Sequence, residues 1–235
     1  MTEWQGAFHF GDYWAAYRGP AGDNELHSHA TLQVTFALVG DLRLTARDGA
    51  TQSGRSLMVR PSTPHRLERH EQVLLLLIEP QTPLCRSLLD MMGSADIADL
   101  PKSVAAEIDL GAPLTACLDH VSAATPPAPQ ALDPRLQQAI DHLESAAEEL
   151  PLAVVAKRSG LSESRLRALA TEELQVPLSK WVLWRKLRRS AEELATGADI
   201  ASAALAGGFA DQAHFTRTMK RLIGLTPGMA AEPFR

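Results

Sequence analysis

The most constraining feature of this sequence is a short pattern that occurs twice in its last third. Residues 200–228 contain a run of small residues suited to a helix, a Gly-Gly-Phe turn, and a second helical run that ends at Gly224. Residues 152–177 have the same order, with Gly160 standing 48 residues before Gly208. Two short helices joined by a glycine turn are typical of a helix-turn-helix, whose second helix fits a DNA major groove. The two copies predict an all-α domain that binds two successive groove segments.

The second copy also carries a distinctive order of residues. From Ala204 to Pro227 it reads AxxxGFxDQxHFTRxxKRxxGxTP, where x is any residue. This resembles the C-terminal signature of the AraC/XylS family of bacterial transcription regulators, and the resemblance covers about residues 133–230. A generic helical bundle would need neither the duplicated turns nor the ordered polar residues. The resemblance implies a sequence-specific regulator of transcription that binds double-stranded promoter DNA and is not an enzyme.

The bases are expected to be read by the first turns of each second helix, where residues three or four apart share a face. By resemblance, Ser164, Arg167 and Ala168 fall on base-contacting positions of the first unit. An arginine fork matches the edge of guanine, and a glutamine amide matches adenine. The predicted DNA-binding residues are Ser164, Arg165, Arg167, Ala168, Gln212, Ala213, His214, Arg217 and Lys220.

The sequence departs from the family pattern at four positions. Ala170 and Met219 stand where the family usually has Phe, and Gln175 replaces a common Gly after the first recognition helix. Ala210 stands where a capping Ser is usual, and the loss of such a cap costs about 1 kcal/mol. We expect these changes to weaken packing and capping without altering the residues that face the groove. We assign Asp211 an electrostatic role at the helix N-terminus.

The distribution of charge is compatible with DNA binding, although the whole chain has a net charge of −5. Residues 1–132 hold 9 Lys/Arg and 15 Asp/Glu, whereas residues 133–235 hold 14 and 13. Attraction to phosphates depends on where the charges are placed rather than on their total. Two basic stretches are expected to contact phosphates: Lys180, Arg185, Lys186, Arg188 and Arg189 in one, and Arg217, Lys220 and Arg221 in the other.

Other bulk properties restrict the class of protein. The sequence has no run of 18 apolar residues, and its first residues lack a basic segment followed by an apolar one. This favours a soluble cytoplasmic protein with no membrane partner. The two cysteines, Cys85 and Cys117, have no CxxC spacing, which favours ordinary reduced thiols.

The pattern along the chain predicts a multidomain α+β protein. Short β-prone runs at 32–39, 42–45, 56–60 and 73–78 predict a small sandwich or barrel. We therefore expect a cupin-like effector-binding β-barrel at 1–80, a helical dimerisation region at 81–124, a Pro-rich linker at 125–132 and the DNA-binding domain at 133–235. The apolar residues at 84–121 favour a homodimer, with coverage of their own barrel as the alternative. The expected helices are one that opens at Asp133-Pro134 and others at 152–158, 163–174, 178–195, 200–206 and 211–223. Trp181, Trp184, Phe209 and Phe215 are expected in the core.

The front of the sequence holds a second motif. His27, His29 and Gln33 precede Gly40, and His65 ends a later Pro-rich turn. This resembles the two motifs of the cupin barrel, with Gln33 in place of the usual ligand Glu and Ser62 in place of a Gly. Residues 27, 29 and 33 would share one strand face. The four residues are therefore candidates to line an effector pocket. Three histidines could also hold a divalent transition metal, and the sequence leaves a metal and a metal-free polar pocket about equally open.

Two other functions compete with a ligand-responsive regulator. One is a metal-dependent cupin dioxygenase or isomerase that uses His27, His29 and His65. The tethered double helix-turn-helix and the missing Glu at position 33 argue against that enzyme. The other is a sequence-independent DNA binder, which would require a more basic domain than residues 133–235 provide.

Overall fold

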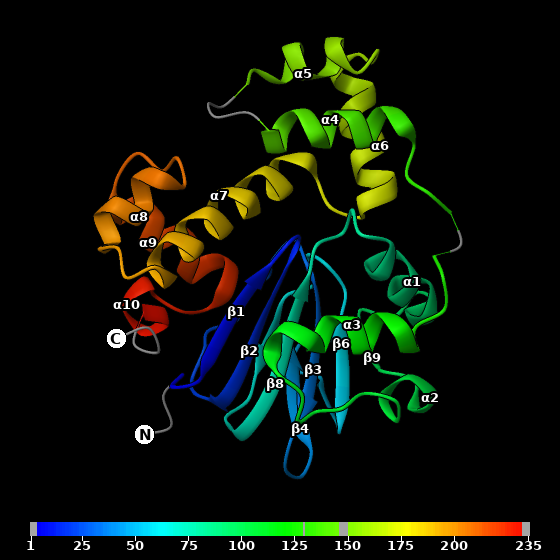
Figure 1. Cartoon of the computed structure of the whole chain (residues 1–235), viewed down its shortest axis with the longest axis vertical. Coiled ribbons are helices and arrows are strands. Elements are labelled where there is room, and N and C mark those ends of the chain that lie inside the picture. Colours follow the sequence, from blue (N-terminus) through cyan, green and yellow to red (C-terminus); the bar gives the residue numbers. More distant parts are fainter. Residues whose placement is uncertain (1–3, 129, 146–149, 232–235) are drawn as a thin grey trace.

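The computed structural model describes residues 4–128, 130–145 and 150–231 (Figure 1). The described strands form two antiparallel sheets, one six-stranded in the order β1-β2-β8-β3-β6-β9 and one three-stranded in the order β5-β4-β7. Their bounds are β1 Ala7–Gly11, β2 Trp14–Ala21, β3 Leu32–Ala37, β4 Leu42–Ala46, β5 Thr51–Gly54, β6 Ser56–Val59, β7 His65–Leu67, β8 His70–Ile78 and β9 Ile97–Asp99. The helices are α1 Pro83–Met92, α2 Lys102–Ala105, α3 Leu114–Ala124, α4 Pro134–Ser145, α5 Leu152–Arg158, α6 Glu163–Leu174, α7 Leu178–Ala195, α8 Ile200–Ala206, α9 Gln212–Ile223 and α10 Pro227–Ala231. None of the described helices is long and apolar enough to cross a membrane.

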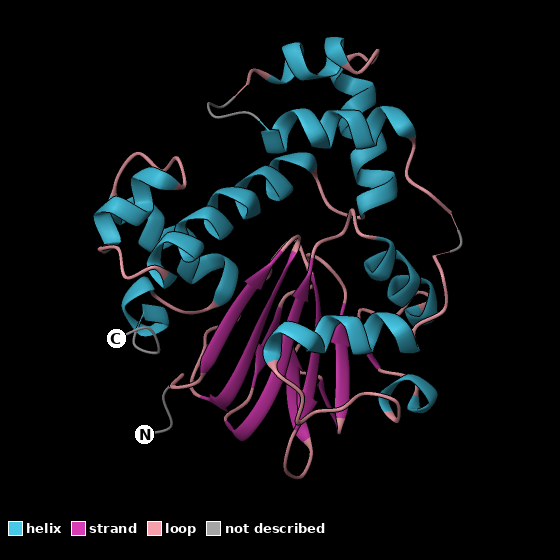
Figure 2. Ribbon diagram, in the orientation of Figure 1, coloured by secondary structure: helices cyan, strands magenta, loops and turns pink. Residues whose placement is uncertain are grey.

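The architecture confirms the predicted fold class, a β-rich front part with accessory helices followed by an all-α part (Figure 2). We call the elements from β1 to α3 the β-domain and those from α4 to α10 the helical domain. The four predicted strand runs correspond to β3, β4, β6 and β8. The prediction did not define β1 and β2, because glycine, alanine and Pro20 interrupt the β-prone residues there.

The larger sheet has apolar cover on one face from its own helices. Leu88 and Leu89 of α1 and Val121 of α3 pack with Val34 and Leu76 of the sheet in one buried cluster. The opposite face shares a core with the smaller sheet. The apolar residues of 84–121 therefore cover their own sheet, as the alternative in the sequence interpretation proposed, and dimerisation through them stays a prediction.

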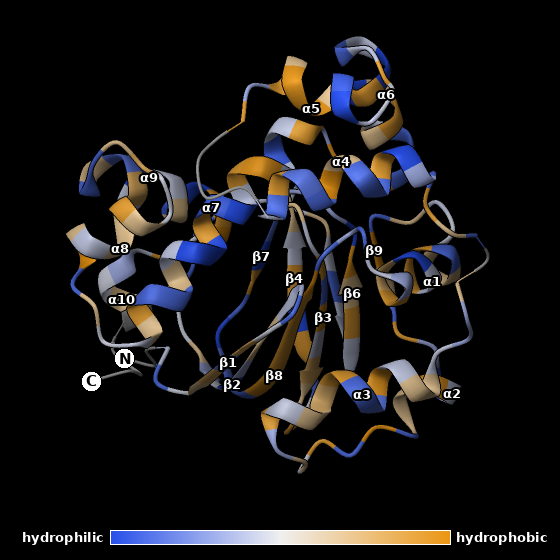
Figure 3. Cartoon of the chain, turned by 45° about the horizontal axis from the view of Figure 1, so that its top comes forward, coloured by the Kyte–Doolittle hydropathy of each residue, from blue (hydrophilic) through white to orange (hydrophobic). Residues whose placement is uncertain are grey.

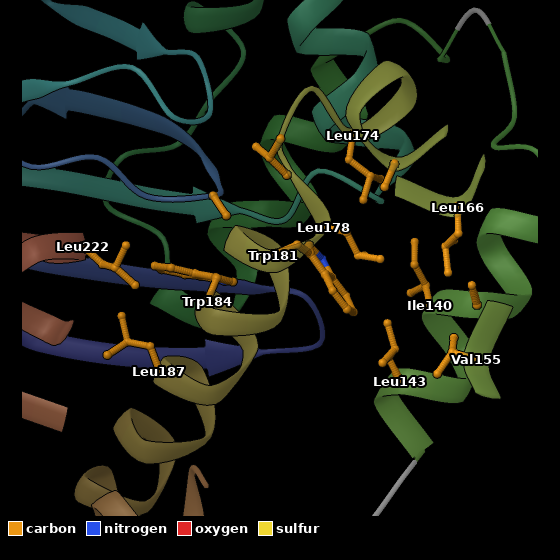
Figure 4. Close-up of a cluster of buried hydrophobic side chains, with 14 of the residues drawn as sticks. Ile140, Leu143, Val155, Leu166, Leu174, Leu178, Trp181, Trp184, Leu187 and Leu222 are labelled. Carbon is orange, nitrogen blue, oxygen red and sulfur yellow. The ribbon is translucent and has the colours of Figure 1, made fainter. Parts of the chain in front are cut away.

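The helical domain contains the two predicted helix-turn-helix units, α5–α6 and α8–α9, joined by the long helix α7. Both apolar and polar residues are distributed along these helices, as expected for amphipathic helices (Figure 3). Trp181 of α7 lies among Leu178 and Ile140 and Leu143 of α4, whereas Trp184 points toward Leu187 and Leu222 (Figure 4). The predicted core positions of both tryptophans, Phe209 and Phe215 are confirmed, since all four are buried.

The caps explain where the recognition helices begin. Ser162 is the N-cap of α6, and its Oγ accepts a hydrogen bond from Arg165 N at 3.2 Å. In the second unit the expectation of a lost cap at Ala210 is wrong. Asp211 is itself the N-cap residue, and its Oδ1 accepts from His214 N at 2.6 Å. The cap has moved by one residue, so that α9 begins at Gln212 with its orphan backbone N–H satisfied.

Candidate DNA-reading surface and interdomain site

The recognition helix of the first unit, α6, has one buried and one open face. Leu166, Leu169 and Ala170 are buried in the core of the helical domain. The predicted DNA-binding residues between them, Ser164, Arg165, Arg167 and Ala168, are all exposed. Arg167 pairs with Glu163 one turn earlier at 2.9 Å. An exposed pair of this kind contributes about 0.5 kcal/mol at most, so it leaves the guanidinium available to another partner.

The recognition helix of the second unit, α9, repeats this division. Phe215, Thr218, Met219 and Leu222 are buried. The predicted DNA-binding residues Gln212, Ala213, His214, Arg217 and Lys220 are all exposed. His214 also stands edge-on to the Phe209 ring, with 5.2 Å between centroids. Lys220 differs from the others, because its Nζ lies 2.8 Å from Glu25 Oε1 of the β-domain.

The basic stretch on α7 does not form the expected phosphate-binding face. Arg188 is directed inward and pairs with Glu79 of the β-domain at 3.3 Å and with Glu144 of α4 at 3.2 Å. Arg185 pairs with Glu144, and Arg189 donates to its carbonyl. Buried arginines need carboxylate or carbonyl partners, and these lie on segments far away in the sequence. The prediction of phosphate contact is therefore wrong for Arg185 and Arg188, whose charges are paired, and stays a prediction for the half-buried Arg189. Lys180 is exposed, and Lys186 Nζ lies 3.5 Å from the Gly208 carbonyl.

The two domains share an apolar interface. Ala30 of the β-domain belongs to the core cluster of the helical domain, while Leu225 lies in the core between the two sheets. Trp181 Nε1 donates to Gln81 Oε1 at 3.0 Å, and Trp184 Nε1 donates to Glu79 Oε1 at 3.2 Å. The tryptophans of α7 are thus anchors of the interface as well as of the core. Burial raises the pKa of Glu79, although Arg188 opposes the shift.

A crevice lies between the larger sheet and the helical domain. Its lining is almost entirely apolar and includes Phe8, Tyr17 and Leu77 from the sheet and Trp184 and Met219 from the helices. The lining also includes Glu79 and Arg188. The adjoining pocket shares Tyr17, Leu77 and Met219 and is also lined by His27, His29 and Gln33.

Sequence reasoning missed this crevice, although one signal pointed to it. The run 73–78 is apolar at every position, whereas a strand with one solvated face would alternate. An unbroken apolar run requires cover on both faces of β8. The helices that supply the second cover come about 100 residues later in the chain, so the sequence does not indicate which element does so.

The predicted polar residues of the β-domain are brought together. The three histidines and Gln33 are buried, and one ring nitrogen of each histidine lies within 4.8 Å of those of the other two. Gln33 Oε1 lies 3.1 Å from Nε2 of both His29 and His65, and its Nε2 lies 3.0 Å from Thr35 Oγ1. We call these four residues the histidine cluster.

Burial sets the charge of the histidine cluster. It lowers the pKa of all three histidines, to about 4 for His29. The Nδ1 atoms of His27 and His65 face the carbonyls of Glu25 and Thr63 at 2.8 and 2.9 Å. A carbonyl oxygen can only accept, so in the neutral rings these Nδ1 atoms carry the hydrogen and Nε2 is an acceptor. The histidine cluster is therefore neutral near pH 7 and presents lone pairs to its centre.

The ring nitrogens of the histidine cluster are of a type that binds transition metals, but the neutral amide of Gln33 already lies between the imidazoles of His29 and His65. Ligands bound at about 2.0–2.1 Å in a tetrahedral site stand closer together than 4.8 Å. A half-turn of the Gln33 amide would place its two N–H donors toward His29 and His65 and its oxygen toward the Thr35 hydroxyl. Every polar group named would then have a partner without a metal.

The fold resembles crystal structures of ToxT from Vibrio cholerae. An apo variant of ToxT is 12% identical, with a TM-score of 0.65 over 96% of this chain and 99% of the other. ToxT with a bound unsaturated fatty acid is also 12% identical, with a TM-score of 0.62 over 93% and 94%. ToxT bound to (E)-4-(8-methylnaphthalen-1-yl)but-3-enoic acid is 11% identical, with a TM-score of 0.61 over 95% and 100%. No curated protein sequence matches the chain.

A family model described as a helix-turn-helix domain matches residues 155–232, which include both recognition helices and the signature residues of the second unit. The last third of the chain therefore matches a helix-turn-helix domain, and the fold of the whole chain resembles that of ToxT. The match to a helix-turn-helix domain favours a DNA-binding regulator over the cupin dioxygenase or isomerase. The matched helix-turn-helix domain includes α9 with its exposed polar residues, and the β-rich domain precedes it.

Proposed function

We propose that the chain is an AraC-family regulator that reads a two-part DNA site and that a small amphiphilic molecule controls its DNA binding. The observation that carries the proposal is the apolar crevice between the sheet and helices α7 and α9. A molecule in that crevice would contact the β-domain as well as α7 and α9, and α9 is the recognition helix of the second unit. Its binding energy would therefore depend on how the two domains are arranged, as a regulatory ligand requires.

The DNA-reading part of the proposal rests on the exposed faces of α6 and α9. Arg167 and Arg217 are the candidates for guanine or phosphate contact, and Gln212 is the candidate for adenine. Ser164, Arg165, Ala168, Ala213 and His214 complete the proposed faces. Lys220 would reach a phosphate only after leaving Glu25.

The lining of the crevice defines the class of effector. An elongated apolar body would fit among Phe8, Leu77 and Met219, and one polar group would find partners at either end. The ToxT structures hold an unsaturated fatty acid and a naphthalenyl butenoic acid, both apolar molecules with one carboxyl group. We propose the same class here, with Arg188 and the histidine cluster as the polar ends. The histidine cluster would act as a metal-free lining, with Gln33 supplying an amide.

The first experiment tests the DNA-reading function. The full-length chain is used to select binders from a library of random-sequence duplex DNA. The proposal expects enrichment of one sequence with two conserved parts about one helical turn, or about 10 base pairs, apart. Enrichment of no sequence over the starting library would contradict it.

The second experiment tests the effector site with palmitoleate as the probe. Palmitoleate should raise the Tm of the protein and change its affinity for the selected DNA; a ligand at 100 times its Kd stabilises by about 2.7 kcal/mol. Ala191→Leu fills the crevice and should abolish both effects. Ala123→Leu, an exposed change on α3, is the matched control and should keep both. Equal responses of the two variants would remove the crevice as the effector site.

A further inference from the structure

The two recognition helices end at equivalent residues, and both of these residues contact the β-domain. Gln175 follows α6 and Gly224 follows α9, 49 residues apart at the same place in the repeat. Each is the C-cap of its helix with a left-handed backbone, at φ 57° and 77°. The bases are read from the opposite, N-terminal ends of the same helices.

The contact at Gly224 is a close approach of backbone to backbone. Glu25 N donates to the Gly224 carbonyl at 3.4 Å, and Lys220 pairs with Glu25 one turn earlier. A Cβ atom at position 224 would lie only 2.8 Å from both the Glu25 carbonyl oxygen and His27 Nδ1. Glycine is therefore required here for its backbone conformation and for the space it leaves.

The contact at Gln175 uses a side chain instead. Arg60 Nη1 donates to Gln175 Oε1, while the rest of the guanidinium donates to the carbonyls of Ala95 and Gly93. A left-handed backbone disfavours any residue with a Cβ, and Gly is the usual occupant of such a cap. The glutamine thus holds an unfavourable conformation and makes an interdomain hydrogen bond that glycine could not make.

The two contacts originate from one connected part of the β-domain. His27 N donates to the His65 carbonyl at 3.0 Å, and His65 N donates back at 2.9 Å. Ser62 N donates to the His29 carbonyl at 2.7 Å. These bonds join the segment that carries Glu25 to the segment that carries Arg60. Glu25 and Arg60, which contact the C-terminal ends of the two recognition helices, are therefore fixed relative to each other.

We propose that the β-domain sets the relative placement of the two recognition helices, and that Arg60 and Gln175 are positioning residues that select the spacing between the two halves of the DNA site. The two units are connected by α7 and by one turn at each end of α7. These turns allow the units to rotate relative to each other. The two C-cap contacts restrict that rotation without covering the exposed reading faces. The inference rests on the DNA-reading faces proposed above and adds the determinant of spacing.

The test uses the full-length chain and the DNA sequence that it selects. Duplexes are made in which the spacer between the two halves is lengthened or shortened by one or two base pairs. The wild-type protein should prefer one spacer by about tenfold or more, in the range usual for coupled sites. Arg60→Ala and Gln175→Gly should both lower that preference severalfold and should do so to the same extent when combined, since they remove one contact.

Gln175→Gly separates positioning from stability. Glycine adopts the left-handed cap more readily, so this variant should unfold at the same or a higher temperature. A purely structural role would then leave the spacing preference intact or improve it. Arg55→Ala removes another exposed arginine, which bonds the Gly40 carbonyl, and serves as the control that should keep the preference.

Three outcomes would overturn the proposal. The first is an unchanged spacing preference in both variants. The second is a uniform rise in affinity at every spacing, which would make the contacts inhibitory rather than positional. The third is a wild-type protein that selects a single half-site, which would leave DNA binding established but no spacing to set. Enrichment of no DNA would instead contradict the reading faces themselves, and the positioning role with them.

Discussion

At the residue scale, the sequence predicted side chains correctly where their surroundings are local. The alternation of buried and exposed residues on α6 follows from helical periodicity, so the exposure of Arg167 could be read from the spacing alone. The inward direction of the Arg188 side chain could not be predicted from the spacing. Its partner Glu79 lies 109 positions earlier in the numbering, and no local pattern connects them. The convergence of His27, His29, Gln33 and His65 was accessible only because their spacing resembles a known motif.

Arg167 is the residue with the clearest expected effect on specificity. Arg167→Ala should cost about 1–3 kcal/mol on the selected site and relax the preference at one or two base positions. Affinities for the selected site and for random duplex DNA, measured at the same salt concentration, give the comparison. Arg43→Ala on the exposed face of β4 is the matched control. An equal loss on both DNAs would reduce Arg167 to a phosphate contact.

His29 should make the stability of the protein depend on pH. Burial lowers its pKa from 6.5 to about 4, so between these values the unfolded chain binds a proton that the folded chain does not. The stability is therefore complete above about pH 6.5 and falls as the pH decreases, by up to about 1.4 kcal/mol per pH unit. His29→Gln should make the slope of unfolding free energy against pH shallower by up to that amount. A slope that changes after dialysis against EDTA would contradict the metal-free histidine cluster.

At the element scale, the bounds of helices α5 to α9 were predicted within a residue because their signals are local. Ser162 caps α6, and the glycine turns ended helices where the repeat placed them. The cap of α9 was misplaced because the family pattern has a capping Ser at the position of Ala210, whereas Asp211 performs the same role one residue later. The strands β1 and β2 were missed because their stability comes from pairing, β1 with β2 and β2 with β8, rather than from β-prone residues.

The N-cap of α9 gives a prediction at this scale. Asp211→Ala should lower the free energy of unfolding by about 0.5–2 kcal/mol and weaken DNA binding, because α9 loses its N-terminal hydrogen bond. Asp211→Ser keeps an acceptor and should retain most of the stability. Urea unfolding of both variants provides the measurement. If the serine variant were as unstable as the alanine variant, the carboxylate charge and not the cap would be responsible.

At the scale of the whole molecule, the two domains should unfold together. Each contributes side chains to the core of the other, and Trp184 belongs to the core and bonds Glu79 across the interface. Trp184→Ala should cost about 3–5 kcal/mol and separate one unfolding transition into two. Trp184→Phe keeps most of the apolar volume and should keep a single transition. Two transitions in the wild-type chain, followed by circular dichroism and tryptophan fluorescence, would contradict a shared core.

One face of β8 is covered only by helices that follow much later in the chain, and this affects folding during synthesis. Leu75 and Leu77 face the crevice and are covered by α7 and α9, which are synthesised about 100 and about 140 residues later. At roughly 5–20 residues per second, part of this apolar strand face stays open to water for about 7–30 s. During that interval the nascent chain offers a surface that other nascent chains or chaperones can bind. The synthesis of the second helix-turn-helix unit is therefore also the step that covers the aggregation-prone face of the β-domain.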